Sequence, residues 1–371
     1  MKRLVLAGGG HSHLFVLEAF VNAPPPDVEV VLINRTLHAP YSGMLPGLVA
    51  GLYEFDECHI HLEQLTQRGN IRFLQTSVTH AGLGQKQIML EDGSTLSYDV
   101  LSINTGSTPP LVNTPGALGN VLPIKPIEDF LVGWKAMRVK IAASNRAMRV
   151  VLVGGGAGSV ELALAMQYAL RSNHRHRTQF EIVCDTSDIL TTHNDYVRRT
   201  FRRILQRRRI EIRANSRVVS VADGQLVFQQ GTEARYDFIV WVTGASPAEW
   251  PRRAGLASND GGFIAVNEYL QSASHPDVFA AGDIAAQINQ PRSRSGVYAV
   301  RQGEPLVQNL RNALMGRPLQ RYTPQTRALA LISTGDPYAV ASWGHFGFAG
   351  RWVWRWKDRI DRRFIDRFDK P

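Results

Sequence analysis

The chain has 371 residues, of which 44% are hydrophobic, and a formal net charge of +10. This length favours two domains, and the apolar content supplies enough material for two cores. A positive charge suits an acidic cofactor, an anionic membrane face or nucleic acid. The sequence contains no nucleic-acid-binding module, so we expect no nucleic-acid partner.

Two cysteines, Cys58 and Cys184, stand far apart and form no CxxC pair. This spacing argues against a redox disulfide and a zinc site, and we expect no bound metal. The apolar run at residues 4–7 is too short for a signal peptide. No stretch approaches the roughly 18 apolar residues of a membrane span, so we expect a cytoplasmic protein, with peripheral contact to the inner face of the cell membrane left open.

A glycine-rich turn follows the first apolar run. Residues 4–7 predict a buried parallel strand, and residues 14–21 predict a helix after it. Between them the pattern G-x-G-x-x-G is matched at Gly8 and Gly10, while His13 stands at the third glycine position. Backbone amides in such a turn and at the start of its helix bind a pyrophosphate. We therefore expect a dinucleotide here; an ordinary strand-to-helix turn is the alternative.

The next strand, predicted over residues 28–33, lacks the acid that dinucleotide folds place at its end to bind ribose hydroxyls. Asn34 stands there and can still bond a hydroxyl, and Arg35 follows, in reach of a phosphate or the adenine. Both could also be plain loop residues. The loop over residues 38–47, which includes Ser42, has few charges and could pass close to a planar ring system. A strand and a hairpin with an Asp-Gly turn follow.

The glycine motif occurs a second time, at Gly154 and Gly156, with Ser159 at the third glycine position. Each copy is followed by a strand that runs from Tyr-Asp to Thr-Gly with the same spacing. These two strands end at Thr105 and Gly106 and at Thr243 and Gly244. Chance does not readily give such a repeat, so the sequence predicts an α/β protein with two Rossmann-like dinucleotide-binding domains.

The second strand of the second copy, over residues 180–185, does end in an acid, Asp185. A carboxylate at this place favours NADH because it repels a 2′-phosphate, although a turn or capping aspartate is the alternative. The basic helix predicted over residues 194–209 is most simply a solvated face. Docking to an anionic lipid or protein is the second interpretation.

Further along the chain, an apolar strand ends at Gly282 and leaves the carboxylate of Asp283 at its terminus, where it could accept hydrogen bonds from a polyol. In the tail, residues 352–368 have helical periodicity, with aromatic side chains predicted on one face and arginines opposite. Such a helix suits a membrane interface. Packing on the protein's own core is the alternative that we slightly favour.

With these motifs in this order, residues 1–315 resemble the pyridine nucleotide-disulfide oxidoreductase superfamily, and among its members most closely the type II NADH:quinone oxidoreductases. The resemblance implies an FAD-binding domain at 1–115 plus 248–315, an NAD(P)H-binding domain at 116–247, and a C-terminal extension at 316–371 with an amphipathic helix. It implies that FAD contacts Gly8, Gly10, His11, Ser12, His13, Asn34, Arg35, Ser42, Val78, Thr105, Gly106, Gly282 and Asp283. It implies that NADH contacts Gly154, Gly156, Ser159, Asp185 and Gly244, with NADPH disfavoured.

One stretch departs from the quinone reductases of this type. They carry Ala-Gln-x-Ala-x-Gln-Gln-Gly after the Gly-Asp, whereas residues 296–303 here retain only Ala299, Gln302 and Gly303 of that pattern. The missing cysteine pair argues against disulfide reductases and sulfide:quinone reductases. The start Gly-Gly-Gly-His-Ser-His resembles a branch whose members are sometimes fused to a selenophosphate synthetase, and whether a further domain follows residue 371 stays open.

We therefore expect a flavoprotein that takes hydride from NADH and passes electrons to an acceptor, in the first instance a quinone. Glu161, near the start of the second helix, is the candidate for positioning the nicotinamide or relaying a proton, with helix capping as the alternative. Gln302 is the candidate on the acceptor side. Two other readings stay open: a non-quinone acceptor (a redox protein, a small molecule or a selenium compound), and a slow-turnover flavoprotein that acts as a sensor or interaction module. A homodimer is also left open as an assembly of this chain.

Overall fold

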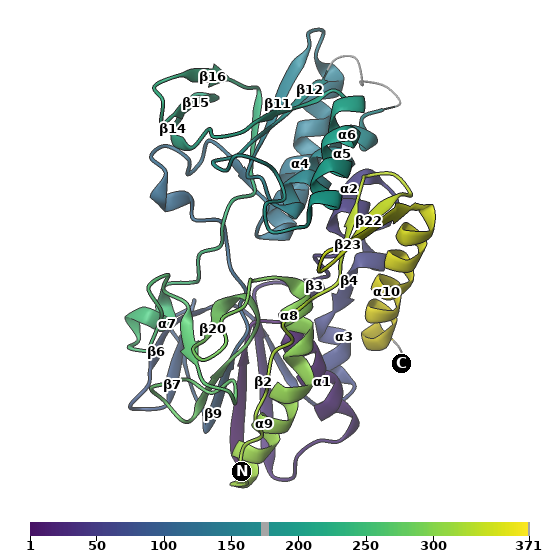
Figure 1. Ribbon diagram of the computed structural model, residues 1–371. Helices are drawn as coiled ribbons and strands as arrows, with labels where there is room; N and C mark the ends of the chain where they lie inside the picture. Colours follow the sequence, from purple (N-terminus) through teal and green to yellow (C-terminus); the bar gives the residue numbers. More distant parts are fainter. Residues whose placement is uncertain (172–177, 370–371) are drawn as a thin grey trace.

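The computed structural model describes residues 1–171 and 178–369. Two α/β units lie one above the other, and the C-terminal helix runs along their side (Figure 1). The sheet of the first unit has the strand order β19-β9-β1-β2-β5, and all of its pairings are parallel. Its strands are β1 (Lys2–Ala7), β2 (Val28–Asn34), β5 (Arg72–Gln75), β9 (Val100–Ile103) and β19 (Val278–Ala280).

The second unit repeats this arrangement, with the parallel order β10-β17-β11-β12-β13. In both units the central strand is apolar and buried, as expected for a parallel sheet covered on both faces. Each central strand leads through the glycine turn into a helix, α1 (His11–Asn22) or α5 (Ala157–Ala169). The predicted α/β fold is therefore confirmed. The strands are β10 (Leu122–Pro123), β11 (Met148–Val153), β12 (Thr178–Val183), β13 (Ile210–Arg213) and β17 (Phe238–Trp241).

Smaller elements surround the two sheets, and each unit adds an antiparallel three-stranded meander that includes the predicted hairpin. The helix α3 begins at Leu62, because the preceding residues pair as β4 with β3. The other strands are β3 (His38–Pro40), β4 (His59–His61), β6 (Val78–Gly82), β7 (Gln87–Leu90), β8 (Thr95–Ser97), β14 (Val218–Ala222), β15 (Gln225–Phe228), β16 (Glu233–Arg235), β18 (Ile264–Val266) and β20 (Ala285–Gln287). The other helices are α3 (Leu62–Gln67), α4 (Ile127–Ala143), α6 (Asp195–Arg207), α7 (Trp250–Arg253), α8 (Gly296–Arg301) and α9 (Gly303–Met315), with short 3-10 helices at Asp56–Cys58, Leu111–Asn113 and Gly282–Ile284.

The two units share a core through the short helix α2 (Leu45–Ala50), which belongs to the first unit by sequence but lies against α5 (Figure 1). Leu45 and Val49 are buried in the same apolar cluster as Val160 and Leu164 of the second unit. The units therefore meet through packed side chains as well as through the linking chain.

The C-terminal extension consists of an antiparallel sheet, β21 (Ala330–Ser333), β22 (Ala339–Trp343) and β23 (Phe346–Gly350), followed by α10 (Arg351–Asp369). The expected single aromatic face of this helix is wrong, because Val353 and Phe368 are buried whereas Trp352 and Trp356 are exposed. No helix in the described part of the chain is long and apolar enough to cross a bilayer.

The buried side of α10 also contains a charged pair. Lys357 Nζ lies 2.5 Å from Asp361 Oδ2 and donates a hydrogen bond of 2.7 Å to the carbonyl of Gly43. Because each charge has a partner, both side chains can leave water. Trp352 and Trp356 lie on a neighbouring stripe of the helix and stay exposed.

Candidate functional site

A cavity of about 400 Å³ opens at the carboxyl ends of β1, β2 and β9. This is the edge of a parallel sheet where dinucleotides bind. The structure gathers here most of the residues that the sequence predicts for FAD. They are Gly8, Gly10, His11, Asn34, Arg35, Ser42, Val78, Thr105, Gly106, Gly282 and Asp283.

The first glycine turn presents backbone amides to this cavity. Gly10 is the N-cap of α1 and has no side chain to cap the helix, while Asn104 Oδ1 accepts a hydrogen bond of 3.3 Å from the His13 amide in the first turn. Uncapped N–H groups at a helix start favour an anion, so the turn fits the pyrophosphate of FAD. A Cβ on Gly10 would lie 2.3 Å from Asn104 Oδ1, so glycine is needed here to let Asn104 pack on the turn.

Ser12 and His13 depart from the expected arrangement, because their side chains are buried and do not line the cavity. Ser12 Oγ donates to the carbonyl of Ala299 at 2.7 Å. The His13 ring lies 2.5 Å from the Gly8 carbonyl through Nδ1 and 2.8 Å from Ser102 Oγ through Nε2. Burial lowers the pKa of His13 to about 4. These side chains brace the turn, and only their backbone can face a cofactor.

At one end of the cavity, the Asp283 carboxylate forms an ion pair of 2.9 Å with Lys125 Nζ. Gln302 Oε1 accepts a hydrogen bond of 2.6 Å from the Gly282 amide, so Gln302 holds the turn that carries Asp283. Burial lowers the pKa of His11, which faces the same end, to about 4. Sequence reasoning missed Lys125 because it lies in the proline-rich crossing between the two units.

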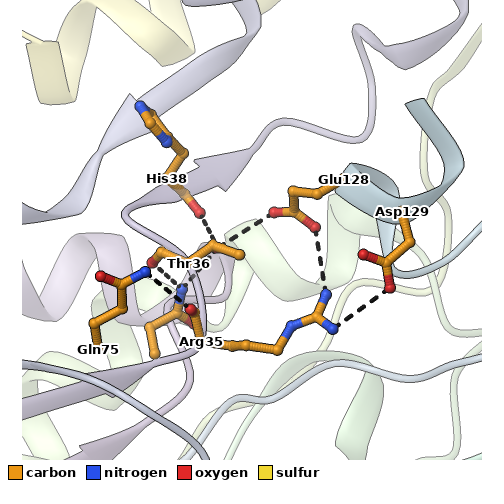
Figure 2. A network of polar contacts seen from close by, with 7 residues as sticks. Arg35, Thr36, His38, Gln75, Glu128 and Asp129 are labelled. Atoms are coloured by element: carbon orange, nitrogen blue, oxygen red, sulfur yellow. Dashed lines mark hydrogen bonds and ion pairs between the residues drawn. The ribbon is translucent and has the colours of Figure 1, made fainter. Parts of the chain in front are cut away.

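At the other end, Asn34 Oδ1 accepts a hydrogen bond of 2.8 Å from the Gly9 amide, and its Nδ2 donates to the Thr36 carbonyl at 2.8 Å. The side chain expected to bind the ribose is thus engaged by the turn itself. Arg35 points instead toward Glu128 and Asp129 in the first turn of α4 (Figure 2). Glu128 also lines the cavity, and the sequence analysis did not single it out.

The second glycine turn is more open. Gly154 has a φ of +133°, and a Cβ there would lie 2.9 Å from the Val242 carbonyl oxygen, so the backbone requires glycine. A Cβ on Gly156 would meet nothing within 4 Å among the described atoms. Gly156 is nevertheless the N-cap of α5, where a pyrophosphate would approach. This open cradle fits NADH.

The remaining predicted NADH residues have different environments. Asp185 is exposed two residues beyond the end of β12, where it can take ribose hydroxyls. Gly244 lies three residues beyond the end of β17 and has a φ of +55°. Ser159 is buried, and its Oγ has no hydrogen-bond partner among the described residues. Ser159 therefore occupies the place where the helix packs on the sheet and offers no side-chain contact to a ligand.

The two candidate catalytic residues lie apart. The Glu161 carboxylate accepts hydrogen bonds from the Ser333 amide at 2.7 Å and from Ser333 Oγ at 3.0 Å, so β21 covers it. Burial raises the pKa of Glu161, and the nearby Lys357 ammonium and the Ser333 bonds oppose that rise. Gln302 lies beside Gly282 instead. Glu161 thus faces the C-terminal extension, and its catalytic role stays a prediction.

Two dinucleotide folds in series, one with a cavity that ends at Asp283 and one with an open glycine turn, define a flavin-dependent pyridine-nucleotide oxidoreductase. The comparison with protein families agrees. The family described as pyridine nucleotide-disulphide oxidoreductase matches residues 2–303, and the chain belongs to this family. It is an FAD-dependent enzyme that uses a pyridine nucleotide.

Individual relatives agree with this assignment. Demethylphylloquinone reductase NdbB from Synechocystis is 27% identical over 355 residues, which cover 90% of this chain and 85% of the relative. The sulfide:quinone oxidoreductase structure from Aquifex aeolicus has a TM-score of 0.83 at 19% identity, covering 100% of this chain and 92% of that one. The structure of NDH2 from Plasmodium falciparum in complex with NADH has a TM-score of 0.76 at 16% identity, covering 98% of each chain. At these identities the two structures show a shared fold.

Proposed function

We propose that the protein takes hydride from NADH and passes electrons through FAD to a quinone. The name of the relative NdbB, a demethylphylloquinone reductase, supports a quinone acceptor. The observation that carries the proposal is the aromatic wall between the Asp283 end of the cavity and α10. Tyr41 stacks on Phe364 of α10 with ring centroids 4.4 Å apart, and the His11 ring lies 5.4 Å from Tyr41. A planar, apolar acceptor suits such neighbours.

When bound, FAD supplies the hydride acceptance and the release of electrons. The residues of this chain bind and orient the reactants. The open Gly156 turn receives the pyrophosphate of NADH, and the exposed Asp185 carboxylate takes its ribose hydroxyls, which favours NADH over NADPH. Gln302 fixes the turn at Gly282, and Lys125 holds the Asp283 carboxylate in place. The aromatic wall keeps water from the acceptor side.

The outer side of the extension supports the approach of a lipid-dissolved acceptor. We define the aromatic surface as the exposed residues Trp343, Phe346, Phe348, Trp352, Trp356 and Ile360. The rings of Trp352 and Trp356 are stacked with centroids 6.5 Å apart, and Phe348 lies 6.3 Å from Trp352. The exposed Arg355 and Arg359 lie along the same stripe of α10. Aromatic rings beside arginines match the interface of an anionic bilayer, so we propose peripheral binding to the inner face of the membrane.

An anaerobic titration tests the acceptor. The purified protein should absorb between about 350 and 500 nm as an oxidised flavoprotein, bleach with NADH and recolour at once with a short-chain quinone. Phe364→Ser should slow recolouring while leaving the NADH bleaching rate unchanged. Bleaching of the wild type without recolouring would contradict the quinone and direct the search to other acceptors.

Liposome flotation tests the membrane contact. The double variant Trp352→Ser/Trp356→Ser should lose flotation with vesicles that contain phosphatidylglycerol. The matched control is Val132→Ser/Val139→Ser, because these α4 residues are 72% and 64% exposed but lie outside the aromatic surface. Equal flotation of the two double variants would rule out the aromatic surface as the anchor.

A further inference from the structure

The ends of the second strands in the two units show where a carboxylate is missing. In the first sheet Ala7 pairs with Ile33, and in the second Val153 pairs with Val183. Counting onward from these pairs, Asn34 corresponds to Cys184, and Arg35 corresponds to Asp185. At this position the first unit therefore has the cationic Arg35, whereas the second unit has Asp185, the acid that we assign to ribose binding.

A carboxylate nevertheless reaches this end of the cavity from α4. Glu128 lies in the first turn of α4, beyond the crossing to the second unit, and lines the cavity together with Asn34 and Thr36. Thr36 Oγ1 lies 3.3 Å from Glu128 Oε1 and 2.8 Å from the carbonyl of His38, and these two acceptors share its one proton. Figure 2 shows the Glu128 carboxylate between Thr36 and the Arg35 guanidinium.

Glu128 also retains capacity to accept further hydrogen bonds. The Arg35 guanidinium lies 4.0 Å from Glu128 Oε2, which is an ion-pair distance and longer than a hydrogen bond. The Glu128 side chain is 26% exposed, so it is held in place while remaining open to the cavity. A carboxylate has about four acceptor positions, and the contacts with Thr36 and Arg35 leave some of them unused.

Other polar groups near this end do not offer the same chemistry. The Asn34 amide is engaged by Gly9 and Thr36. Among the described residues that line the cavity, Asp283 is the other carboxylate, and Lys125 holds it at the opposite end. Asp129 does not line the cavity, and its side chain is 60% exposed.

We propose that Glu128 accepts hydrogen bonds from the adenosine ribose hydroxyls of FAD, so that the second unit supplies the acid that β2 lacks. The proposal rests on the assignment of FAD to this cavity. Hydroxyl donors to an ionised carboxylate form strong, charge-assisted bonds. Since the same carboxylate pairs with Arg35, the adenosine half of FAD binds at the contact between α4 and the first unit.

The test measures FAD binding to the apoprotein by the quenching of flavin fluorescence. Glu128→Ala should raise the dissociation constant of FAD about tenfold, because a hydrogen bond to a charged group is lost. Asp129→Ala is the matched control, since it removes the neighbouring charge and the other Arg35 partner without touching the cavity. Its dissociation constant should stay within about twofold of the wild type.

A second ligand separates ribose recognition from a structural role. An FAD analogue with a 2′,3′-dideoxyadenosine ribose should bind about tenfold more weakly than FAD to the wild type and equally with FAD to Glu128→Ala. If Glu128→Ala does not fold, Glu128→Gln replaces it, because glutamine keeps the shape of the side chain. The preference of Glu128→Gln for FAD over the analogue should be smaller than that of the wild type. An unchanged preference for FAD over the analogue in these variants would overturn the proposal. A wild type that binds no FAD would instead contradict the cofactor assignment.

Discussion

The two glycine turns of this chain follow the same sequence pattern and the same strand register, yet their glycines serve different purposes. In the first turn, a Cβ on Gly10 would lie 2.3 Å from Asn104 Oδ1. In the second, a Cβ on Gly156 would meet no described atom within 4 Å. At this position the first turn needs glycine for the packing of the protein itself, whereas the second turn leaves a space for a ligand. An identical motif can therefore report on stability in one unit and on binding in the other.

The variant Gly10→Ala is the first test of this comparison. It should lower the free energy of unfolding by about 3 kcal/mol, because Asn104 must move to admit the methyl group. Denaturant unfolding followed by circular dichroism measures the change. A variant as stable as the wild type would show that the first turn is no more tightly packed than the second.

The second difference between the two turns is a histidine whose protonation changes the stability of the protein. His13 occupies the third glycine position of the first turn, and burial lowers its pKa to about 4 from an ordinary value near 6.5. The unfolded chain therefore takes up this proton first as the pH falls, so stability is lost below about pH 6.5 and continues to fall toward pH 4. When the pH falls from 7 to 5, protonation of this histidine in the unfolded chain should lower the free energy of unfolding by about 2 kcal/mol.

His13→Gln should flatten that pH dependence, and the exposed His80→Gln serves as its control. The measurement is denaturant unfolding at both pH values. Parallel curves for wild type and His13→Gln would disprove the assignment.

The third prediction concerns Asp185, the acid that follows β12 in the second unit and has no counterpart after β2 in the first unit. Asp185→Ala should reduce the preference for NADH over NADPH about tenfold, because the repulsion of a 2′-phosphate is removed. Steady-state kcat/KM with each nucleotide measures it. If the selectivity does not move, Asp185 is not the ribose-binding acid.

The smallest effect on stability is expected for Gly156→Ala, within about 0.5 kcal/mol of the wild type, since a Cβ there meets no described neighbour. Its NADH dissociation constant should nevertheless rise about fivefold, because the methyl group stands where the pyrophosphate approaches. FAD content, measured by absorbance, should not change. Loss of FAD instead of NADH affinity would reverse the roles of the two turns.

The sequence predicted those parts of the site that one strand and its own turn determine. Gly8, Gly10, Thr105 and Asp283 come together because parallel strands end at the same edge of a sheet. Glu128 and Lys125 could not be predicted this way. They lie after β9, where the chain crosses to the second unit, and their position depends on how α4 packs over the cavity.

Side-chain direction was also harder to predict than position. His13 matches the third glycine of the motif, but its ring fits between the turn and β9, so it faces the core. In α10, periodicity gave the spacing of the aromatic residues without showing which stripe the protein covers. The Lys357–Asp361 pair could not be foreseen, because charges are buried only when a partner from elsewhere, here the Gly43 carbonyl, is also present.

The packing of α2 against α5 has a consequence for how the chain folds while it is being synthesised. Residues 1–144 are synthesised before β11 and α5, so the apolar side of α2, with Leu45 and Val49, has no α5 to pack on during that interval. Exposed apolar surface of this kind favours aggregation and chaperone binding. The first unit therefore completes its fold only after α5 has been synthesised, and its edge strand β19 (Val278–Ala280) comes later still.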